Sequence, residues 1–576
     1  MLGAAFAAEW PDPGQLLVNA GHDPSEHEIL LSWMERAPGE TVAHVHGLRV
    51  RGHDNLPPFD LYFREDGEPL GQSELRELGI APKQWDAPAA AQPPSDDIPY
   101  SIKAADQPRV VGTAPLDLIA LPPLDLDAVR AEDAARERDG AKQAQRIGVF
   151  REFDGPVTVD GGETSHGAWR TADNGERVWS LSIYSPEAEG LRLEFSQLDL
   201  PDGAHVVVYD IFDPDVVEGP FRTIPGGDET LWTPTIFAEE VVVECVVPGD
   251  ATLDGVTIHM DRLAHQYAAF DDLLKRGAGA CNLDAACYED WLQESYGVGG
   301  LGAVGNEGTL WCTGSLLAGA QGNDAGRMLL TADHCLGSRS PGDVEVYWFY
   351  QRDECGGTIP AVSSVPRTTG GADLLVSSPH GQGTDVALLR LRNAAPSGVT
   401  ALGWSNEAWG PETPVTSIHH PRGSYKRISF GDIEPFDNSD HSSVGPENYI
   451  KVVWNEGTTE PGSSGSPMFL EDLGLIIGQL WGGTASCSNP LGPDYYGRFD
   501  QSFPLMKNWL FEPVDRDEDV NNDGFVNAVD IQIVINAVLG LPLPDGVTED
   551  DVDVNNDGKV DARDIQRVIN AVLGVS

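Results

Sequence analysis

Gly462-Ser463-Ser464-Gly465-Ser466-Pro467 sets a serine between two glycines, and two motifs upstream give that serine a chemical meaning. The first is Thr331-Ala332-Asp333-His334-Cys335, and the second is Gly383-Thr384-Asp385 leading into an apolar run. A serine between glycines is on its own a common turn. An imidazole, a carboxylate and a hydroxyl in this order are the three parts of a catalytic triad.

Amide hydrolysis needs a nucleophile, a base that removes its proton, and donors for the oxyanion that develops. Ser464 is the candidate nucleophile, His334 the general base and later acid, and Asp385 the residue that fixes the imidazole tautomer. The backbone N–H groups of Gly462 and Ser464 are the candidate oxyanion hole, each worth roughly 3–4 kcal/mol in the transition state. A capped histidine, a strand-edge aspartate and a turn serine are the structural alternatives for each residue taken singly. The combination favours catalysis, with no cofactor.

The segment from Cys281 to Asp500 resembles the bacterial lysyl endopeptidases, which are secreted chymotrypsin-like serine proteases. The resemblance rests on these stretches: Cys281-Asn282-Leu283-Asp284, Cys312-Thr313-Gly314-Ser315-Leu316, Thr331–Cys335, Ile418-His419-His420-Pro421, Lys426-Arg427-Ile428-Ser429, Thr459-Glu460-Pro461 with the serine motif to Pro467, Gly478-Gln479-Leu480 and Asp494-Tyr495-Tyr496-Gly497-Arg498. It implies a double β-barrel, protein or peptide substrates and secretion.

Cysteine usage agrees with an oxidising compartment, because six of the seven cysteines fall between Cys281 and Cys487 and no Cys-x-x-Cys pair is present. Metal binding is the alternative to disulfides. The spacing alone does not select a pairing, but the family resemblance implies Cys281–Cys487, Cys287–Cys355 and Cys312–Cys335. Cys245 is then a lone thiol in the preceding domain.

The resemblance also places Asp494 at the base of the S1 pocket, where a buried carboxylate would select a substrate ammonium after Lys, or after Lys and Arg. The alternative is that Asp494 caps a surface turn. Trp481 follows Gly478-Gln479-Leu480, where the family's best-known member has a histidine, and this leaves the preference for Lys over Arg open.

A dibasic pair, Lys275-Arg276, precedes the first protease motif and is a candidate maturation site; an exposed basic pair in a loop is the alternative. Ser463 stands immediately before the nucleophile, where trypsin-like zymogens have an aspartate that accepts the freed amine. We therefore expect activation by removal of an occluding pro-region rather than by amine insertion.

An acidic repeat follows the protease region. Its two copies start at Asp519 and Asp553 and have oxygen ligands at positions 1, 3, 5, 9 and 12, a backbone carbonyl at 7 and glycine at 6, as in EF-hand calcium loops. The predicted Ca²⁺ ligands are Asp519, Asn521, Asp523, Phe525, Asn527 and Asp530 in one site, and Asp553, Asn555, Asp557, Lys559, Asp561 and Asp564 in the other.

Each loop runs into a helix with one apolar stripe, formed by Ile531, Val534, Ile535, Val538 and Leu539 and by Ile565, Val568, Ile569, Val572 and Leu573. The duplicated loop and helix resemble a type I dockerin domain, which implies a cohesin-like or cell-surface partner. Positions 10 and 11 hold Ala528-Val529 and Ala562-Arg563 instead of Ser-Thr. A purely structural calcium module is the alternative.

Charge and hydropathy exclude several classes of function. The chain has 576 residues and a formal net charge of −54, which repels nucleic acid and anionic membranes. No run of about 18 apolar residues is present, so we expect no membrane span. Residues 1–8 look like the end of a signal peptide; a disordered N-terminus is the alternative.

The predicted fold class is mainly β: a chymotrypsin-like double β-barrel, preceded by a β-sandwich pro-domain and followed by a small α-helical EF-hand-like calcium domain. Alternating runs such as Trp179, Leu181 and Ile183, or Leu191, Leu193 and Phe195, predict the sandwich. The predicted parts are a pro-region at 1–90, a Pro/Ala-rich linker at 91–147 with a polar helix over 126–145, the sandwich at 148–270, the protease domain at 277–512 and the calcium domain at 517–576. The competing interpretations are a non-enzymatic adhesion or scaffold protein on a protease fold, and a trypsin-like protease of broader specificity.

Overall fold

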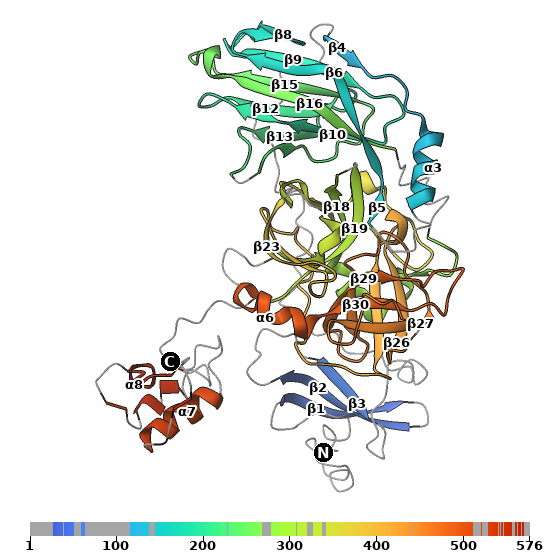
Figure 1. Ribbon diagram of the computed structural model, residues 1–576, viewed down its shortest axis with the longest axis vertical. Helices are drawn as coiled ribbons and strands as arrows, with labels where there is room; N and C mark the ends of the chain where they lie inside the picture. Colours follow the sequence, from blue (N-terminus) through green and yellow to red (C-terminus); the bar gives the residue numbers. More distant parts are fainter. Residues whose placement is uncertain are drawn as a thin grey trace, which may run out of the picture. The chain divides into compact units, whose positions relative to one another are not determined.

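The computed structural model describes the strands of 27–63, then 116–136, 144–226, 228–267, 278–306, 308–319, 326–336, 341–438 and 440–510, and parts of 520–568 (Figure 1). Residues 1–8 and the Lys275-Arg276 pair lie outside the described residues. By backbone contacts the chain divides into two units, and residues 90–317 with 326–502 form the larger one.

Three strands come first along the chain. β1 (His27–Ala37), β2 (Glu40–Val50) and β3 (Phe59–Phe63) form an antiparallel sheet in that order. This sheet falls in the stretch expected to be a pro-region.

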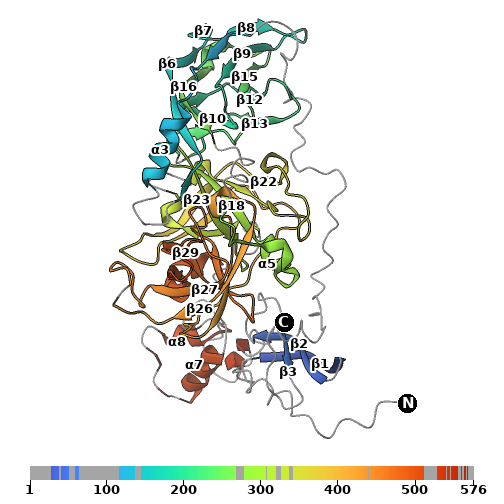
Figure 2. The ribbon, with the colours of Figure 1, turned by 90° about the vertical axis from the view of Figure 1, so that its right-hand side faces the viewer.

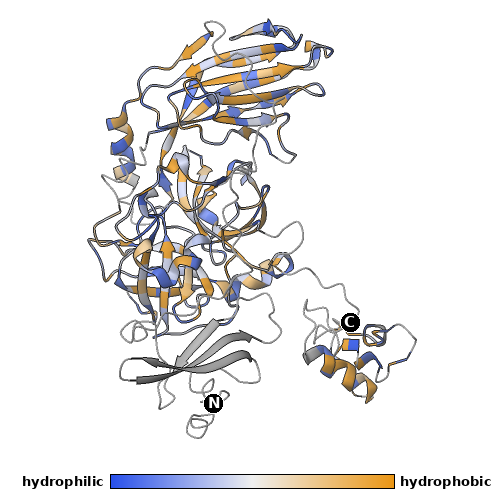
Figure 3. Cartoon of the chain, turned by 180° about the vertical axis from the view of Figure 1, so that it is seen from behind, coloured by the Kyte–Doolittle hydropathy of each residue, from blue (hydrophilic) through white to orange (hydrophobic). Residues whose placement is uncertain are grey.

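Residues 118–266 form a sandwich of two six-stranded sheets. One sheet contains β6 (Gly148–Asp160), β7 (Glu163–Thr164), β10 (Gly190–Phe195), β11 (Gln197–Asp199), β14 (Leu231–Trp232) and β16 (Thr257–Gln266). The other contains β4 (Leu118–Ala120), β8 (Ala168–Thr171), β9 (Arg177–Tyr184), β12 (His205–Asp210), β13 (Val217–Phe221) and β15 (Glu240–Val247). Apolar residues line both sheets in Figure 3.

The sandwich core is built from the alternating residues that the sequence singles out. Trp179, Leu181 and Ile183 of β9 are fully buried against one face, while Val178 packs in a separate cluster on the other face. Leu191, Leu193 and Phe195 of β10 enter the same core from the opposite sheet. The period of two therefore places large side chains between the sheets, and burial of each stabilises the fold by about 1.5–3 kcal/mol.

The predicted polar helix over 126–145 is wrong at its C-terminal end. The helix α3, labelled in Figure 2, covers only Leu126–Arg136, and β5 (Gln145–Arg146), labelled in Figure 1, is a strand. β5 pairs with Leu310 and Trp311 of the protease region, so a long-range ladder overrides local helix propensity there. β4 likewise occupies part of the predicted linker, because Leu118–Ala120 gains a parallel pairing with β9.

Two further sheets make up the protease region, as the predicted double barrel requires. The first holds β18 (Val298–Val304), β19 (Thr309–Leu316), β20 (Met328–Ala332), β21 (Glu345–Tyr347), β22 (Arg367–Thr368), β23 (Ala372–Ser378) and β24 (Val386–Leu391), with β5 added at β19. The second holds β17 (Leu283–Asp284), β25 (Pro414–His419), β26 (Arg427–Glu434), β27 (Tyr449–Glu456), β28 (Pro467–Leu470), β29 (Ile476–Gly483) and β30 (Asp494–Arg498). Since β26 also pairs with β27, the second sheet closes on itself into a barrel.

Short helical turns connect these strands. They are η3 (Leu253–Gly255), η4 (Ala285–Cys287), η5 (Glu289–Trp291), α5 (Leu292–Tyr296), η7 (Asp333–Cys335), η8 (Pro341–Asp343), η9 (Val362–Ser364) and η10 (Pro421–Gly423), and α6 (Phe499–Leu510) ends the region. None of the described helices has the length and apolarity needed to cross a bilayer.

The calcium-domain region contains α7 (Ala528–Val538) and α8 (Glu549–Val552). Val534 and Val568, at equivalent repeat positions, are both fully buried in its core. The apolar stripe is only partly as predicted, because Val538 and Leu539 are exposed and Ile533 is buried instead. Ile569, Val572 and Leu573 lie outside the described residues.

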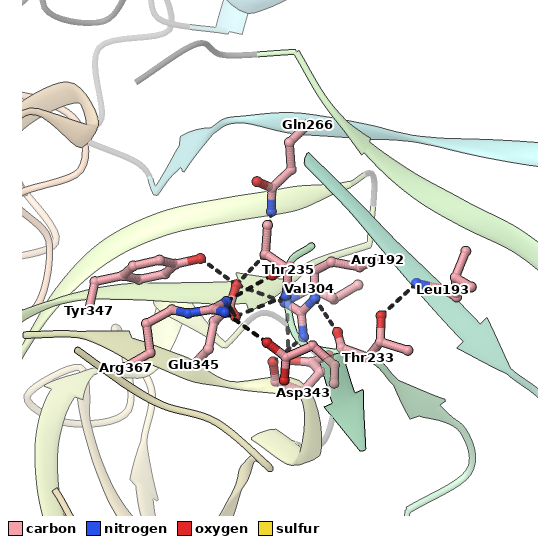
Figure 4. Close-up of polar contacts among 11 residues, drawn as sticks. Arg192, Leu193, Thr233, Thr235, Gln266, Val304, Asp343, Glu345, Tyr347 and Arg367 are labelled. Atoms are coloured by element: carbon pink, nitrogen blue, oxygen red, sulfur yellow. Dashed lines mark hydrogen bonds and ion pairs between the residues drawn. The ribbon is translucent and has the colours of Figure 1, made fainter. Parts of the chain in front are cut away.

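The sandwich joins the first protease sheet through a buried charge network (Figure 4). Glu345 of β21 accepts hydrogen bonds from the N–H (3.1 Å) and hydroxyl of Thr235 and from the Tyr347 hydroxyl (2.7 Å). Arg367 donates to the Thr235 carbonyl (2.9 Å) and pairs with Glu345 (3.3 Å) and with Glu218 of the sandwich (2.8 Å). Burial alone would raise the pKa of Glu345, but Arg192 and Arg367 outweigh it and hold that pKa below its ordinary value.

We expect Arg367→Ala to lower the free energy of unfolding by about 3–5 kcal/mol, because it leaves the buried Glu345 and Glu218 without this counter-ion. Urea unfolding of the full chain measures the change. Arg390→Ala is the matched control: Arg390 pairs with Asp373 at a more exposed site, where a salt bridge is worth about 0–1 kcal/mol. Equal losses in the two variants would show that the network does not stabilise the fold.

Candidate active site

The imidazole of His334 lies in the turn η7, directly after β20, and the carboxylate of Asp385 directly before β24, the strand beside β20. Nδ1 of His334 is 2.6 Å from Oδ2 of Asp385, and the backbone N–H of His334 donates to Oδ1 at 3.2 Å. Because the carboxylate accepts from Nδ1, the other ring nitrogen, Nε2, is left to accept a proton. Asp385 has φ +59, a left-handed backbone that the surrounding contacts must hold.

Burial and the neighbouring carboxylate shift the pKa of His334 in opposite directions. Burial would lower the pKa of His334, but the charge of Asp385 and its hydrogen bond outweigh burial and raise that pKa above its ordinary value. An imidazolium that forms during a reaction is therefore stabilised in place.

Ser464 lies in a loop that glycines shape. Gly462 and Gly465 have φ +93 and +80, values that favour glycine. A Cβ at Gly465 would lie 2.3 Å from Oγ1 of Thr331 and 2.4 Å from the carbonyl oxygen of Thr313, so only glycine lets this loop approach β19 and β20.

The reactive atoms of the nucleophile and the base are both buried. Ser464 is 0% exposed, and Oγ of Ser464 and Nε2 of His334 are both buried atoms without a hydrogen-bond partner among the described residues. In the same part of the chain, the N–H groups of Gly462 and Ser464 have no backbone acceptor, whereas Ser463 donates to Glu460 and Gly465 to Leu480. The two predicted oxyanion donors thus remain available.

The structure contains three disulfides, Cys281–Cys487, Cys287–Cys355 and Cys312–Cys335, which are the pairings implied by the resemblance. Cys312–Cys335 ties the turn that carries His334 to β19. Cys245 is a free cysteine, and burial raises the pKa of its thiol to about 12. The described residues offer one cluster with metal-ligand geometry, Cys312, His334 and Cys335, but its two cysteines are oxidised to a disulfide.

Asp494 does not cap a surface turn. It begins β30, is 0% exposed, and its Oδ2 accepts hydrogen bonds from Nε1 of Trp454 (2.8 Å) and Oγ1 of Thr459 (2.6 Å). A Cβ at Gly483 would lie 2.3 Å from Oδ1 of Asp494, so only glycine lets the end of β29 approach this carboxylate so closely.

Trp481 stands in an aromatic cluster close to the triad. Its ring stacks on His380, with centroids 4.2 Å apart and planes at 15°, and His380 precedes Asp385 by one short loop. His380 also contacts the Tyr449 hydroxyl (2.7 Å) and Ser443 (2.8 Å), and burial lowers the pKa of its imidazole. The sequence analysis missed His380; its place just before the Asp385 motif was the available signal.

Glu460 belongs to a stretch that carries the resemblance, but the sequence analysis gave it no role. Its carboxylate accepts from the backbone N–H of Gly279 (2.7 Å) and the side chain of Asn282 (2.8 Å), and it pairs with Arg422 (3.0 Å). It therefore holds the start of the protease region beside the nucleophile loop. Its partners Gly279 and Asn282 are distant in the sequence, so no local pattern reveals this role.

In the calcium-domain region the position-12 aspartates, Asp530 and Asp564, are both 0% exposed. The backbone N–H of Asn555, at position 3, donates to Asp564 at 3.1 Å and brings the two ends of its loop together. Buried carboxylates among oxygen donors fit Ca²⁺. Asp553 and Lys559 are described, whereas Asp519, Asn521, Asp523, Phe525, Asn527, Asp557 and Asp561 lie outside the described residues.

Comparison with known protein families agrees with this arrangement. Residues 276–497 match the family described as lysyl endopeptidase, C-terminal domain, and residues 118–267 match the lysyl endopeptidase N-terminal domain. The chain is lysyl endopeptidase-like. Residues 517–573 match the dockerin type I domain, so a dockerin module follows the two lysyl endopeptidase domains.

One curated relative is the lysyl endopeptidase of Pseudomonas aeruginosa, 28% identical over 306 residues that cover 48% of this chain and 63% of that protein. The match thus spans less than two thirds of the relative's length. One similar solved structure is human heparin binding protein, which is 17% identical and has a TM-score of 0.28. The alignment covers 38% of this chain and 94% of that chain. Another is the serine endoprotease from Yersinia pestis, 16% identical with a TM-score of 0.26 over 40% and 65%.

We expect Asp385→Asn to lower the pKa of His334 in this lysyl endopeptidase-like domain, because the variant removes the charge that raises it. NMR titration of ¹³C-labelled histidine measures that pKa, and His334→Gln assigns the resonance. Asp373→Asn, whose carboxylate pairs with Arg390 and Arg392, should leave the titration unchanged. An unchanged pKa in Asp385→Asn would contradict the electrostatic role of Asp385.

Proposed function

We propose that the chain is a secreted serine endopeptidase that cleaves peptide bonds after Lys, or after Lys and Arg. The hydrogen bond between His334 and Asp385, beside the glycine-shaped loop of Ser464, is the observation that carries the proposal. A non-enzymatic scaffold would not need an imidazole held by a buried carboxylate next to such a serine loop.

Each active-site residue has its own role in the proposed hydrolysis of the peptide bond. Oγ of Ser464 attacks the substrate carbonyl carbon while Nε2 of His334 takes the hydroxyl proton, and the N–H groups of Gly462 and Ser464 stabilise the oxyanion. The C–N bond breaks as His334 gives that proton to the leaving amine, and an acyl-enzyme remains on Ser464. Water, deprotonated by His334, then releases the acid and restores the serine.

Asp494 is proposed as the base of the S1 pocket. Its burial suits a substrate side chain that brings a positive charge, since a buried carboxylate strongly favours an ammonium or guanidinium over an apolar group. Trp481 and His380 lie in the adjoining cluster, and their stacking is the candidate cause of any change in Lys-over-Arg preference.

The enzyme is proposed to be made as a zymogen that is cut at Lys275-Arg276. Ser463 offers no carboxylate to a new N-terminus, while Glu460 already holds Gly279. We therefore assign activation to the removal of an occluding segment rather than to amine insertion. An uncut chain with full peptidase activity would refute this.

The dockerin module is proposed to bind two Ca²⁺ ions and to attach the enzyme to a cohesin-like or cell-surface partner. The buried Asp530 and Asp564, one in each repeat, support two sites. A purely structural calcium module remains the alternative for the docking role.

A peptide-amide panel with Lys, Arg, Glu, Ala or Phe at P1 tests the activity. We expect cleavage after Lys, or after Lys and Arg, and none with Ser464→Ala. Asp494→Asn should lower kcat/KM for the Lys substrate by about two to three orders of magnitude, because the buried charge pair is lost. Asp432→Asn, which changes a carboxylate bonded to the exposed Asn455, is the control. No cleavage by protein cut at 275–276 would favour the scaffold interpretation.

Removal of Ca²⁺ with a chelator should lower the melting temperature of the C-terminal module and leave the protease transition unchanged. Calorimetry of the full chain resolves the two transitions. Asp530→Asn and Asp564→Asn should each reduce the number of ions bound in a calcium titration, whereas Asp551→Asn, whose carboxylate accepts from Thr548, should not. Identical stoichiometry in all variants would contradict the assigned sites.

A further inference from the structure

One edge of β19 contacts the loop that carries the nucleophile Ser464. The backbone N–H of Thr313 donates to the carbonyl of Ser464 (2.8 Å), and its hydroxyl donates to the carbonyl of Gly462 (3.0 Å). Cys312, one residue earlier, is bridged to Cys335 beside His334. Leu310 and Trp311 therefore lie within about 10 Å of the catalytic loop along the strand, at about 3.3 Å per residue.

The strand β5, which leads into the sandwich, occupies this edge of β19. β18 pairs with one side of β19 along its whole length, and β20 pairs on the other side only at Ser315 and Leu316. On that second side β5 continues the sheet: Gln145 lies opposite Trp311, and Arg146 lies opposite Leu310. The N–H of Ile147 then donates to the Thr309 carbonyl at 2.9 Å.

The segment approaches the catalytic residues at its N-terminal end. Because β5 is antiparallel to β19, the residue before Gln145 points along the sheet toward Cys312. Ala144 packs against the core cluster that contains Cys312 and Cys335. The chain just before β5 thus runs along β19 toward Cys312, which is bridged to the residue after the catalytic histidine.

Strong contacts hold the segment in place. Arg146 is bound by Asp133 (2.7 Å) and Glu132 (3.1 Å) of α3, and Ile147 is buried among Trp311, Tyr347 and Tyr350. The network of Figure 4 anchors the sandwich to the same sheet, since Arg192 donates to the Asp343 carbonyl at 2.6 Å and Thr235 binds Glu345. The occupant is therefore part of a preorganised interface.

We propose that residues 144–147 are a built-in competitor of extended peptide substrates, seated on the edge of β19 that the leaving-group side of a substrate would pair with. Extended peptides bind proteins by adding a strand to an open sheet edge, and one edge accepts one strand. Asp494, on the second barrel, takes the acyl side of the substrate, which directs the amine side toward the first barrel and β19. This inference rests on the proposed function and names the segment that must leave during activation.

The competition predicts a difference between two peptide probes. A Lys-containing octapeptide with four residues after the Lys needs the edge of β19, whereas a tetrapeptide amide that ends in Lys does not. In the full chain with Ser464→Ala, which cannot cut itself, we measure the binding of both by fluorescence anisotropy.

Gln145→Pro is the test variant, because proline removes a ladder N–H. Gln145→Ala is its matched control, because the one hydrogen bond of the Gln145 side chain among the described residues goes to the carbonyl of its neighbour Arg146. The octapeptide should bind at least about fivefold more tightly to the proline variant, as expected for loss of one competing hydrogen bond, while the tetrapeptide binds both equally. Equal octapeptide binding would overturn the inference and leave the proposed function standing. No binding of either probe, together with no hydrolysis by the cut enzyme, would overturn the proposed function itself.

A second measurement needs no variant in β5. Hydrogen exchange of the Ser464→Ala chain should accelerate in the fragment covering 144–150 when the octapeptide is saturating, because the segment is displaced. The tetrapeptide should leave that exchange unchanged. Protection that is the same with both probes would also overturn the inference.

Discussion

The close approach of the Ser464 loop to β19 and β20 is the constraint on which the site depends. It brings the nucleophile of the second barrel onto two strands of the first, one bridged to the histidine turn and the other leading into it. Glycine at 465 makes this possible, because any side chain would meet Thr313 and Thr331. The ladder between β20 and β24 sets His334 against Asp385. The geometry is therefore a property of two packed barrels rather than of any one loop.

The fold class, the protease family, the dockerin module and the three disulfide pairings could be predicted from short motifs and the resemblance that they carry. The roles of the triad, the oxyanion glycines and the calcium ligands, which combine residue types with few other uses together, stay predictions. Sequence reasoning failed where the deciding contact is distant in the chain. Residues 144–146 carry polar, helix-compatible residues, yet β5 forms because β19 has an open edge. His380 and Glu460 matter through partners far away in sequence, such as Trp481 and Gly279, which no local pattern reveals.

Buried charge marks the places where the parts of the larger unit are joined. Glu345 and Arg367 bind across the boundary between sandwich and barrel, and Glu460 binds the start of the protease region to the nucleophile loop. Such pairs give little net stability compared with apolar packing, but each is costly to break on one side only. Their effect is to fix which surfaces meet. Apolar contacts, such as those of Ile147 with the tyrosines of the barrel, then provide the buried apolar surface between these parts.

The sandwich and the catalytic barrel are connected through one shared β-sheet. The sandwich places a strand in the same sheet that carries the histidine, so the two folds share backbone hydrogen bonds and not only side-chain contacts. Because β5 and β19 share a sheet, the conformational order of β19 depends on the presence of the sandwich. An edge strand with unpaired N–H and C=O groups is prone to wrong pairing during folding. The pairing of β5 with β19 completes the sheet and also prevents an extended peptide from pairing with that edge of β19. An enzyme built in this way gains a protected edge while it is made and must give that edge up to work on an extended chain.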